Sequence, residues 1–261
     1  MMTDFQDRPG AITPDSAPDP KRTIIIVLFR ILTVLVLLAA AAAAAFIFIY
    51  LPSSYMKHDQ FPVHMKWRTA TENEVSRAAS KIFSDADQEA SAQGFHPVKT
   101  FIPWHSSYYR PEAKLYLSDD SKTAFMEDCF WYGPKIYCKK ILNTFFENGV
   151  NVLTTNIHYE FNEPEPPWRQ AHDAPKYANL EILYSDHLKS VDKAVKEGGV
   201  PVLLTPENVE AVATGFQDKA NQWRAEHGLF QKVPGLESYQ PTYHAALNRV
   251  LISLKLRSVS K

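Results

Sequence analysis

The sequence predicts an α+β protein with a single N-terminal transmembrane helix followed by one globular domain. The first observation is an unbroken apolar run at residues 31–50, ILTVLVLLAAAAAAAFIFIY. The second is a change of hydrophobic period beyond residue 70, from helical spacing to short strand-like segments and back. This order predicts a domain over residues 71–261 with one helix, an antiparallel β-meander of about five strands, and three C-terminal helices.

The apolar run has the length of a membrane span. Its 20 residues extend for about 30 Å as a helix, which is the thickness of a bilayer's hydrocarbon core. We therefore expect a transmembrane helix over residues 23–51, with Pro52 ending it, and we expect the lipid bilayer to be a partner through residues 31–50. A cleaved signal peptide is the competing interpretation, because Ala39 to Ala45 offer small residues to a peptidase. The run continues past these alanines, which favours an uncleaved signal-anchor.

The charges that flank the span predict its orientation. Lys21, Arg22 and Arg30 lie on the N-terminal side, whereas only Lys57 is close on the other side. The positive-inside tendency then places the N-terminus in the cytoplasm and the C-terminal domain outside it, in the periplasm or the extracellular space. Residues 1–22, rich in Asp and Pro, are expected to be a disordered cytoplasmic tail, and residues 52–70 a juxtamembrane linker.

The overall charge is balanced, with 28 Lys and Arg against 29 Asp and Glu. Nucleic-acid binders usually carry a basic stripe, so no nucleic-acid partner is expected. The sequence also lacks a Gly-rich phosphate loop, a nucleophile elbow, and the HExxH, CxxC and EF-hand patterns. We accordingly expect no cofactor and no resident metal.

Cys129 and Cys138 bracket the segment CFWYGPKIYC. If Gly133-Pro134 is a two-residue hairpin turn, the two cysteines face each other at a non-hydrogen-bonded position, with Cα atoms about 4.5 Å apart. A disulfide tolerates this spacing and would form in an oxidising compartment. Two reduced core cysteines are the alternative.

The remaining elements follow from spacing and turn signals. Thr71 and Glu74 form a capping box for a helix that runs to Gln93. Later helices are expected from Leu180 to Gly198-Gly199, from Thr205-Pro206 to His227-Gly228, and over about 242–257. The last of these ends in basic residues and either packs into the core, which we favour, or lies on a membrane surface. Strands are expected near residues 97–102, 108–117, 123–132, 135–146 and 150–159.

Four residues are candidates for catalysis or metal binding. His158 and Glu160 would point the same way on a strand, and His172 follows across a proline-rich loop, so the three could share a ligand sphere. A solvated strand end is the simpler interpretation. His187 lies on the apolar stripe of a predicted helix, where a hydrogen-bonded core histidine is more common than a general base.

An aromatic segment offers a recognition surface. Trp104, His105 and Tyr108 lie in a stretch where prolines restrict the backbone, and Trp168 lies in a later loop. Amphipathic aromatic side chains on a preorganised loop suit a binding site, although the same residues also suit a core. We therefore expect a membrane-anchored, non-enzymatic binding or interaction module whose partner is a protein or a small apolar ligand. The alternative is a membrane-anchored hydrolase or metal-dependent enzyme.

Overall fold

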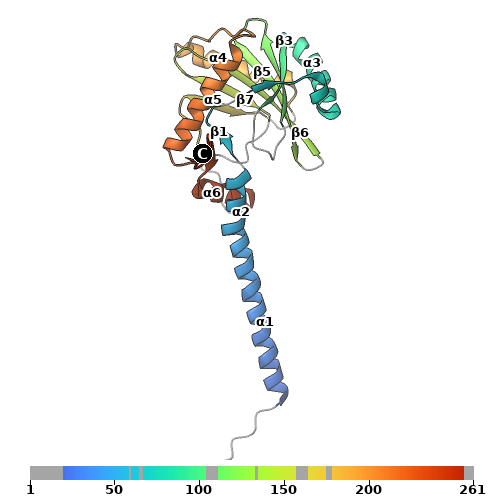
Figure 1. The fold of residues 1–261 in the computed structure, drawn as a ribbon, viewed down its shortest axis with the longest axis vertical. Helices are drawn as coiled ribbons and strands as arrows, with labels where there is room; N and C mark the ends of the chain where they lie inside the picture. The colour runs from blue at the N-terminus through green and yellow to red at the C-terminus, as the bar shows by residue number, and fades with distance from the viewer. Residues whose placement is uncertain are drawn as a thin grey trace, which may run out of the picture. The chain divides into compact units, whose positions relative to one another are not determined.

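The computed structural model describes residues 20–58, 60–64, 67–103, 111–132, 135–156, 164–174 and 178–255. It is an α+β protein with a long apolar N-terminal helix and a mostly antiparallel sheet of seven strands (Figure 1). The chain forms two compact units, one ending at Ile47 and the other beginning at Phe48.

One helical stretch contains the apolar run. Helix α1 (Pro20–Ala45) continues through a π-helical turn, Phe46–Tyr50, into α2 (Leu51–His58). Within it, Val27–Lys57 is long and apolar enough to cross a membrane. The prediction that Pro52 ends the helix is wrong. Proline has no amide hydrogen, and its ring crowds the carbonyl four residues earlier, but the wider π-helical turn just before Pro52 accommodates it.

The carbonyl that Pro52 leaves without an α-helical donor is that of Phe48. The Tyr243 hydroxyl, at the start of α6 (Tyr243–Ser253), donates a hydrogen bond to this oxygen. One residue further along, the Ser53 hydroxyl donates to the Ile49 carbonyl at 2.7 Å. Side chains therefore satisfy the backbone where the proline interrupts the helical ladder.

A small sheet accompanies α2 and α6. Strand β1 (Phe61–Pro62) pairs antiparallel with β10 (Ser238–Pro241), which also pairs with β9 (Phe230–Lys232). Helix α6 packs against α2. The segment 52–70, expected to be a linker, thus contributes a helix and strand β1 to the second unit, together with β2 (Trp67–Thr69) of the large sheet.

The large sheet is a meander with one exception. Strands β2 to β7 are antiparallel in sequence order, and β8 pairs parallel with β7. Strand β5 has the predicted bounds, β6 and β7 end earlier than predicted, and β8 was not predicted. The strands after β2 are β3 (Phe95–Pro103), β4 (Glu112–Ser118), β5 (Thr123–Tyr132), β6 (Lys135–Phe145), β7 (Asn151–Thr155) and β8 (Arg169–Asp173).

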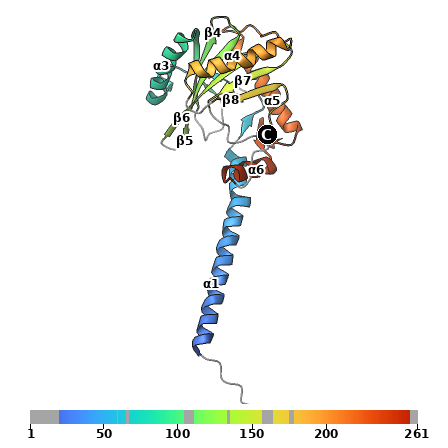
Figure 2. The same ribbon diagram turned by 180° about the vertical axis from the view of Figure 1, so that it is seen from behind.

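Helices cover both faces of this sheet. Helices α3 (Arg77–Ala92) and α4 (Leu180–Lys196) lie on one face and α5 (Val209–Glu226) on the other (Figures 1 and 2). The α3/α4 side is filled around Tyr116 and Leu142, whereas the α5 side is filled around Leu115 and Phe216. The two layers of side chains give the sheet a core on each face.

Helix α3 begins later than its sequence predicts. The Thr71–Glu74 capping box is present, but it caps a single 3-10 turn, Glu72–Glu74. The Ser76 hydroxyl then accepts from the amide of Ala79 and caps α3 itself. The buried carboxylate of Glu112 accepts hydrogen bonds from the Ser76 amide and hydroxyl. A carboxylate from β4 thereby fixes the start of α3 on the sheet.

Candidate functional site

The cysteines oppose each other as predicted. The β5–β6 register pairs Cys129 with Cys138, their Cα atoms are 4.0 Å apart, and their sulfurs form a disulfide. The turn dipeptide Gly133-Pro134 itself lies outside the described residues. Phe83 and Ile82 of α3 pack over the disulfide, so the cross-link is part of the core between α3 and the hairpin.

A row of charges crosses the same face of the sheet next to the disulfide. Lys114, Glu127 and Lys140 occupy directly paired positions on β4, β5 and β6. The Lys140 ammonium lies 3.0 Å from Glu127 and 3.1 Å from Glu89, and Lys114 lies 2.7 Å from Asp87. Asp87 and Glu89 belong to α3, so their ion pairs join this helix to the strands.

Burial dominates the electrostatics of this row. It raises the pKa of Glu127 to about 7, although the neighbouring Lys140 ammonium opposes the rise. It also raises the pKa of Tyr116, whose hydroxyl donates to Asp87 at 3.0 Å. The Asp87 and Glu89 carboxylates hold two of the three row positions in place, and we interpret the row as structural.

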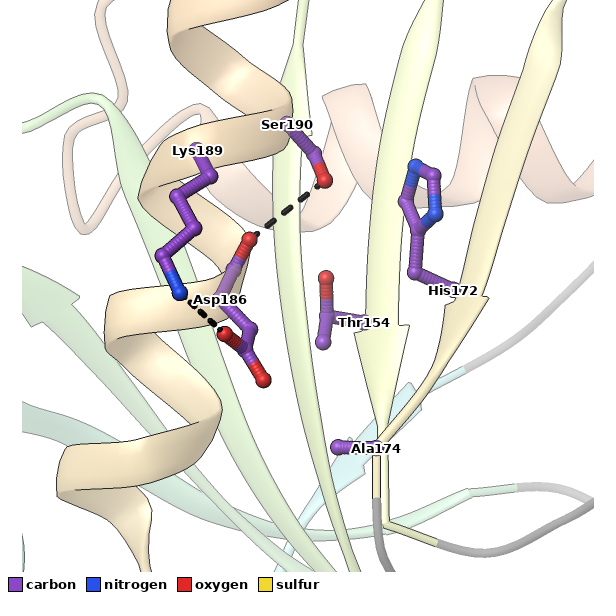
Figure 3. Close-up of a pocket in the computed structure, with 6 residues that line it drawn as sticks. All are labelled: Thr154, His172, Ala174, Asp186, Lys189 and Ser190. Atoms are coloured by element: carbon purple, nitrogen blue, oxygen red, sulfur yellow. Dashed lines mark hydrogen bonds and ion pairs between the residues drawn. The ribbon is translucent and has the colours of Figure 1, made fainter.

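A shallow hollow of about 250 Å³ opens between α4 and the sheet edge (Figure 3). Thr154 from β7 and His172 from β8 are paired residues on parallel strands, so their side chains share a face. Helix α4 contributes the other polar groups. The six lining residues are Thr154, His172, Ala174, Asp186, Lys189 and Ser190.

Two interactions within α4 shape this hollow. The Lys189 ammonium pairs with the Asp186 carboxylate at 2.7 Å, and the Ser190 hydroxyl donates to the Asp186 carbonyl at 3.4 Å (Figure 3). Lys189 and His172 are exposed, whereas Thr154 is buried. The hollow therefore presents a cation, an anion, an imidazole and a hydroxyl within one small surface.

His187 lies directly behind the hollow and is fully buried. Its Nδ1 is 2.9 Å from the Thr154 hydroxyl, and its Nε2 is 2.9 Å from the Thr144 hydroxyl. Thr144 is in turn 2.9 Å from the Thr123 hydroxyl. Each ring nitrogen thus has a hydroxyl partner, one donating and the other accepting, as a neutral imidazole requires.

The surroundings of His187 keep it neutral. Burial, followed by repulsion from His172, lowers its pKa from 6.5 to about 3. An imidazole with no exposed atom and two engaged nitrogens has no free position from which to take a substrate proton. It positions the Thr154 hydroxyl at the wall of the hollow instead.

The structure brings both His172 and His187 next to Thr154, the first as its pair on β8 and the second through a hydrogen bond. It places Trp168 elsewhere, on the α5 side, where its ring lies edge-on to Phe216 and 4.5 Å from the Lys219 ammonium. Trp168 is half-buried, so its cation–π contact with Lys219 is partly accessible to solvent. Trp104, His105, Tyr108, His158 and Glu160 lie outside the described residues, so the predictions made for them stay predictions.

Sequence reasoning missed three polar residues of the hollow: Thr154, Lys189 and Ser190. The helical spacing of 186, 189 and 190 places them on one face of α4, and this pattern could have grouped them. They come close to His172 because β8 pairs parallel with β7. No local sequence pattern predicts this pairing.

One cluster among the described residues has metal-ligating atoms close together: Glu127, Cys129 and Cys138. Because both sulfurs are joined in the disulfide, neither is a thiolate that could bind a metal. Within the described part of the chain, the hollow and the disulfide-braced hairpin remain the features of functional interest. Comparisons with protein-family models, with curated proteins and with solved structures find no match for this chain.

Proposed function

We propose that this protein is a single-pass, membrane-anchored protein that holds a non-enzymatic binding domain on the extracytoplasmic side. The observation that carries the location is the Cys129–Cys138 pair, which closes a hairpin in a chain whose N-terminal helix can span a membrane. Disulfides persist in the periplasm and outside the cell and are rare in the cytosol.

The geometry of the hollow supports binding over catalysis. His187, the candidate general base, is buried and has both nitrogens engaged. The exposed groups around it form a mixed set of donors and acceptors that suits a polar or charged group of a partner. At the hollow, this set favours a protein partner over a small apolar ligand, because four of the six lining residues are charged or hydrogen-bonding side chains that approach solvent.

The location is tested with the full-length protein in its native membrane. Thiols are trapped with acid, alkylated with a large maleimide before and after reduction, and resolved by gel mobility. We expect alkylation of Cys129 and Cys138 only after reduction. Free thiols in the trapped sample would contradict export of the domain.

The binding role is tested by a photo-crosslinking side chain placed at Lys189 in intact cells. Its control is the same side chain at Glu181, an exposed position on the first turn of α4. We expect an adduct from position 189 that weakens when His172→Ala is added, and none from 181. Equal yields from both positions would count against the hollow as the binding site.

A further inference from the structure

Helix α6 has two apolar faces, of which the fold buries one. Ala245, Ala246 and Val250 are buried, so this face belongs to the core, as the sequence favoured. A second stripe runs beside it at helical spacing. Its residues are only partly covered, with Tyr243 45% and Leu254 43% exposed and the two between them half-buried. The stripe consists of Tyr243, Leu247, Leu251 and Leu254.

The hydrogen bond from Tyr243 fixes the depth of this stripe. Its acceptor, the Phe48 carbonyl, lies two residues before the end of the apolar run at Tyr50. At 1.5 Å per residue, that is about 3 Å along the helix from the end of the run. A tyrosine hydroxyl at this level lies in the interfacial zone of a bilayer, where tyrosine rings are enriched.

The position of α6 follows from the same contact. In both views α6 lies beside α2 (Figures 1 and 2), and the two helices pack together. Because α2 continues the helix that contains the apolar run, α6 is tied to the C-terminal end of the span. Lys57 on α2 and Lys255 just after α6 are both exposed, so their ammonium groups can reach the phosphate level while apolar neighbours lie deeper.

We propose that α6 is an interfacial helix whose stripe of Tyr243, Leu247, Leu251 and Leu254 lies in the headgroup–acyl boundary of the leaflet at the C-terminal end of the span. The partner is the lipid surface. This inference rests on the proposed membrane anchor, and it adds a second attachment that holds the domain at one height above the bilayer.

The test uses full-length protein reconstituted in phosphatidylcholine nanodiscs. Because Cys129 and Cys138 are joined in the oxidised protein, a cysteine introduced elsewhere is the single reactive thiol. We label Leu254→Cys with an environment-sensitive fluorophore and add a phosphatidylcholine that carries a nitroxide at the acyl–headgroup boundary. Val195→Cys is the matched control, since Val195 is an apolar residue of α4 with 45% exposure. Leu38→Cys reports on the span.

We expect nitroxide quenching at position 254 to exceed that at 195 by at least about twofold, as burial in the interface requires. A label at Leu251→Cys, in the same stripe, should behave like that at 254. If position 38 is quenched and 254 is quenched no more than 195, the anchor stands and the inference about α6 is overturned. If position 38 is not quenched either, both the anchor and the inference fail.

Discussion

Replacing His187 with glutamine should remove most of the acid sensitivity that the buried imidazole imposes on the domain. Between pH 6.5 and about 3, His187 is protonated in the unfolded state but neutral in the folded state, because burial lowers its pKa to about 3. The free energy of unfolding therefore falls as the pH falls through this window and is fully present above the unfolded pKa of 6.5. Glutamine keeps a donor and an acceptor for Thr144 and Thr154 but does not titrate.

The magnitude follows from the two pKa values. A pH of about 5 lies about 1.5 units below the unfolded pKa of 6.5 but above the folded pKa of about 3. Protonation of the unfolded state therefore costs the wild-type domain about 2 kcal/mol relative to about pH 7.5. Because the substitution also changes the stability at neutral pH, the quantity to compare is the change in the free energy of unfolding between the two pH values. We expect this change to be smaller in the variant by about 2 kcal/mol.

The assay is urea unfolding of the detergent-solubilised full-length protein, followed by tryptophan fluorescence at both pH values. His244→Gln, at an exposed position of α6, controls for the loss of a histidine as such. If the wild type and His187→Gln lose the same free energy on acidification, the burial of His187 is not the cause of acid sensitivity. A change of equal size in His244→Gln would refute the reasoning as well.

Two further predictions concern stability. Gly199→Ala should destabilise the protein by about 1–3 kcal/mol, because the added Cβ would lie 2.7 Å from the Phe146 ring and 2.9 Å from the Ala194 carbonyl oxygen. The control is Gly215→Ala on α5, where the added Cβ meets nothing within 4 Å. Measured by urea unfolding, this variant should be more stable by about 0.5–1 kcal/mol. An equal loss of stability at both positions would contradict this account. Replacing both Cys129 and Cys138 with serine should lower the free energy of unfolding by about 2.5–3 kcal/mol, because the disulfide closes a loop with a sequence separation of 9. A variant whose melting temperature equals that of the oxidised wild type would contradict this prediction.

The local parts of the fold could be predicted from the sequence, and the β5–β6 hairpin shows why. A tight turn fixes the register of the strands it joins, so the position of Gly133-Pro134 was enough to pair Cys129 with Cys138, which the structure confirms. The inward stripe of α4 was equally predictable, because helical periodicity depends only on neighbours within the segment.

The parts that failed depend on distant residues. Strand β8 reads Arg-Gln-Ala-His-Asp, which has no strand signal, and it forms because β7 offers a free edge. Pro52 predicted a helix end by local rules, but the π-helical turn before it and the hydroxyl of Tyr243 make the interruption tolerable. The hollow could not be predicted either, because it forms only where β8 and α4 come together beside Thr154.

The pairing of β1 with β10 has a consequence for how the protein is made. Phe61 pairs with Tyr239, so β1 must wait until β10 has been synthesised. At 5–20 residues per second, the interval is roughly 10–35 s. The β3–β7 meander, whose contacts are local, can form within that time. The β1–β10 pairing therefore forms late in synthesis, and a chain that stops short of β10 would emerge with β1 unpaired.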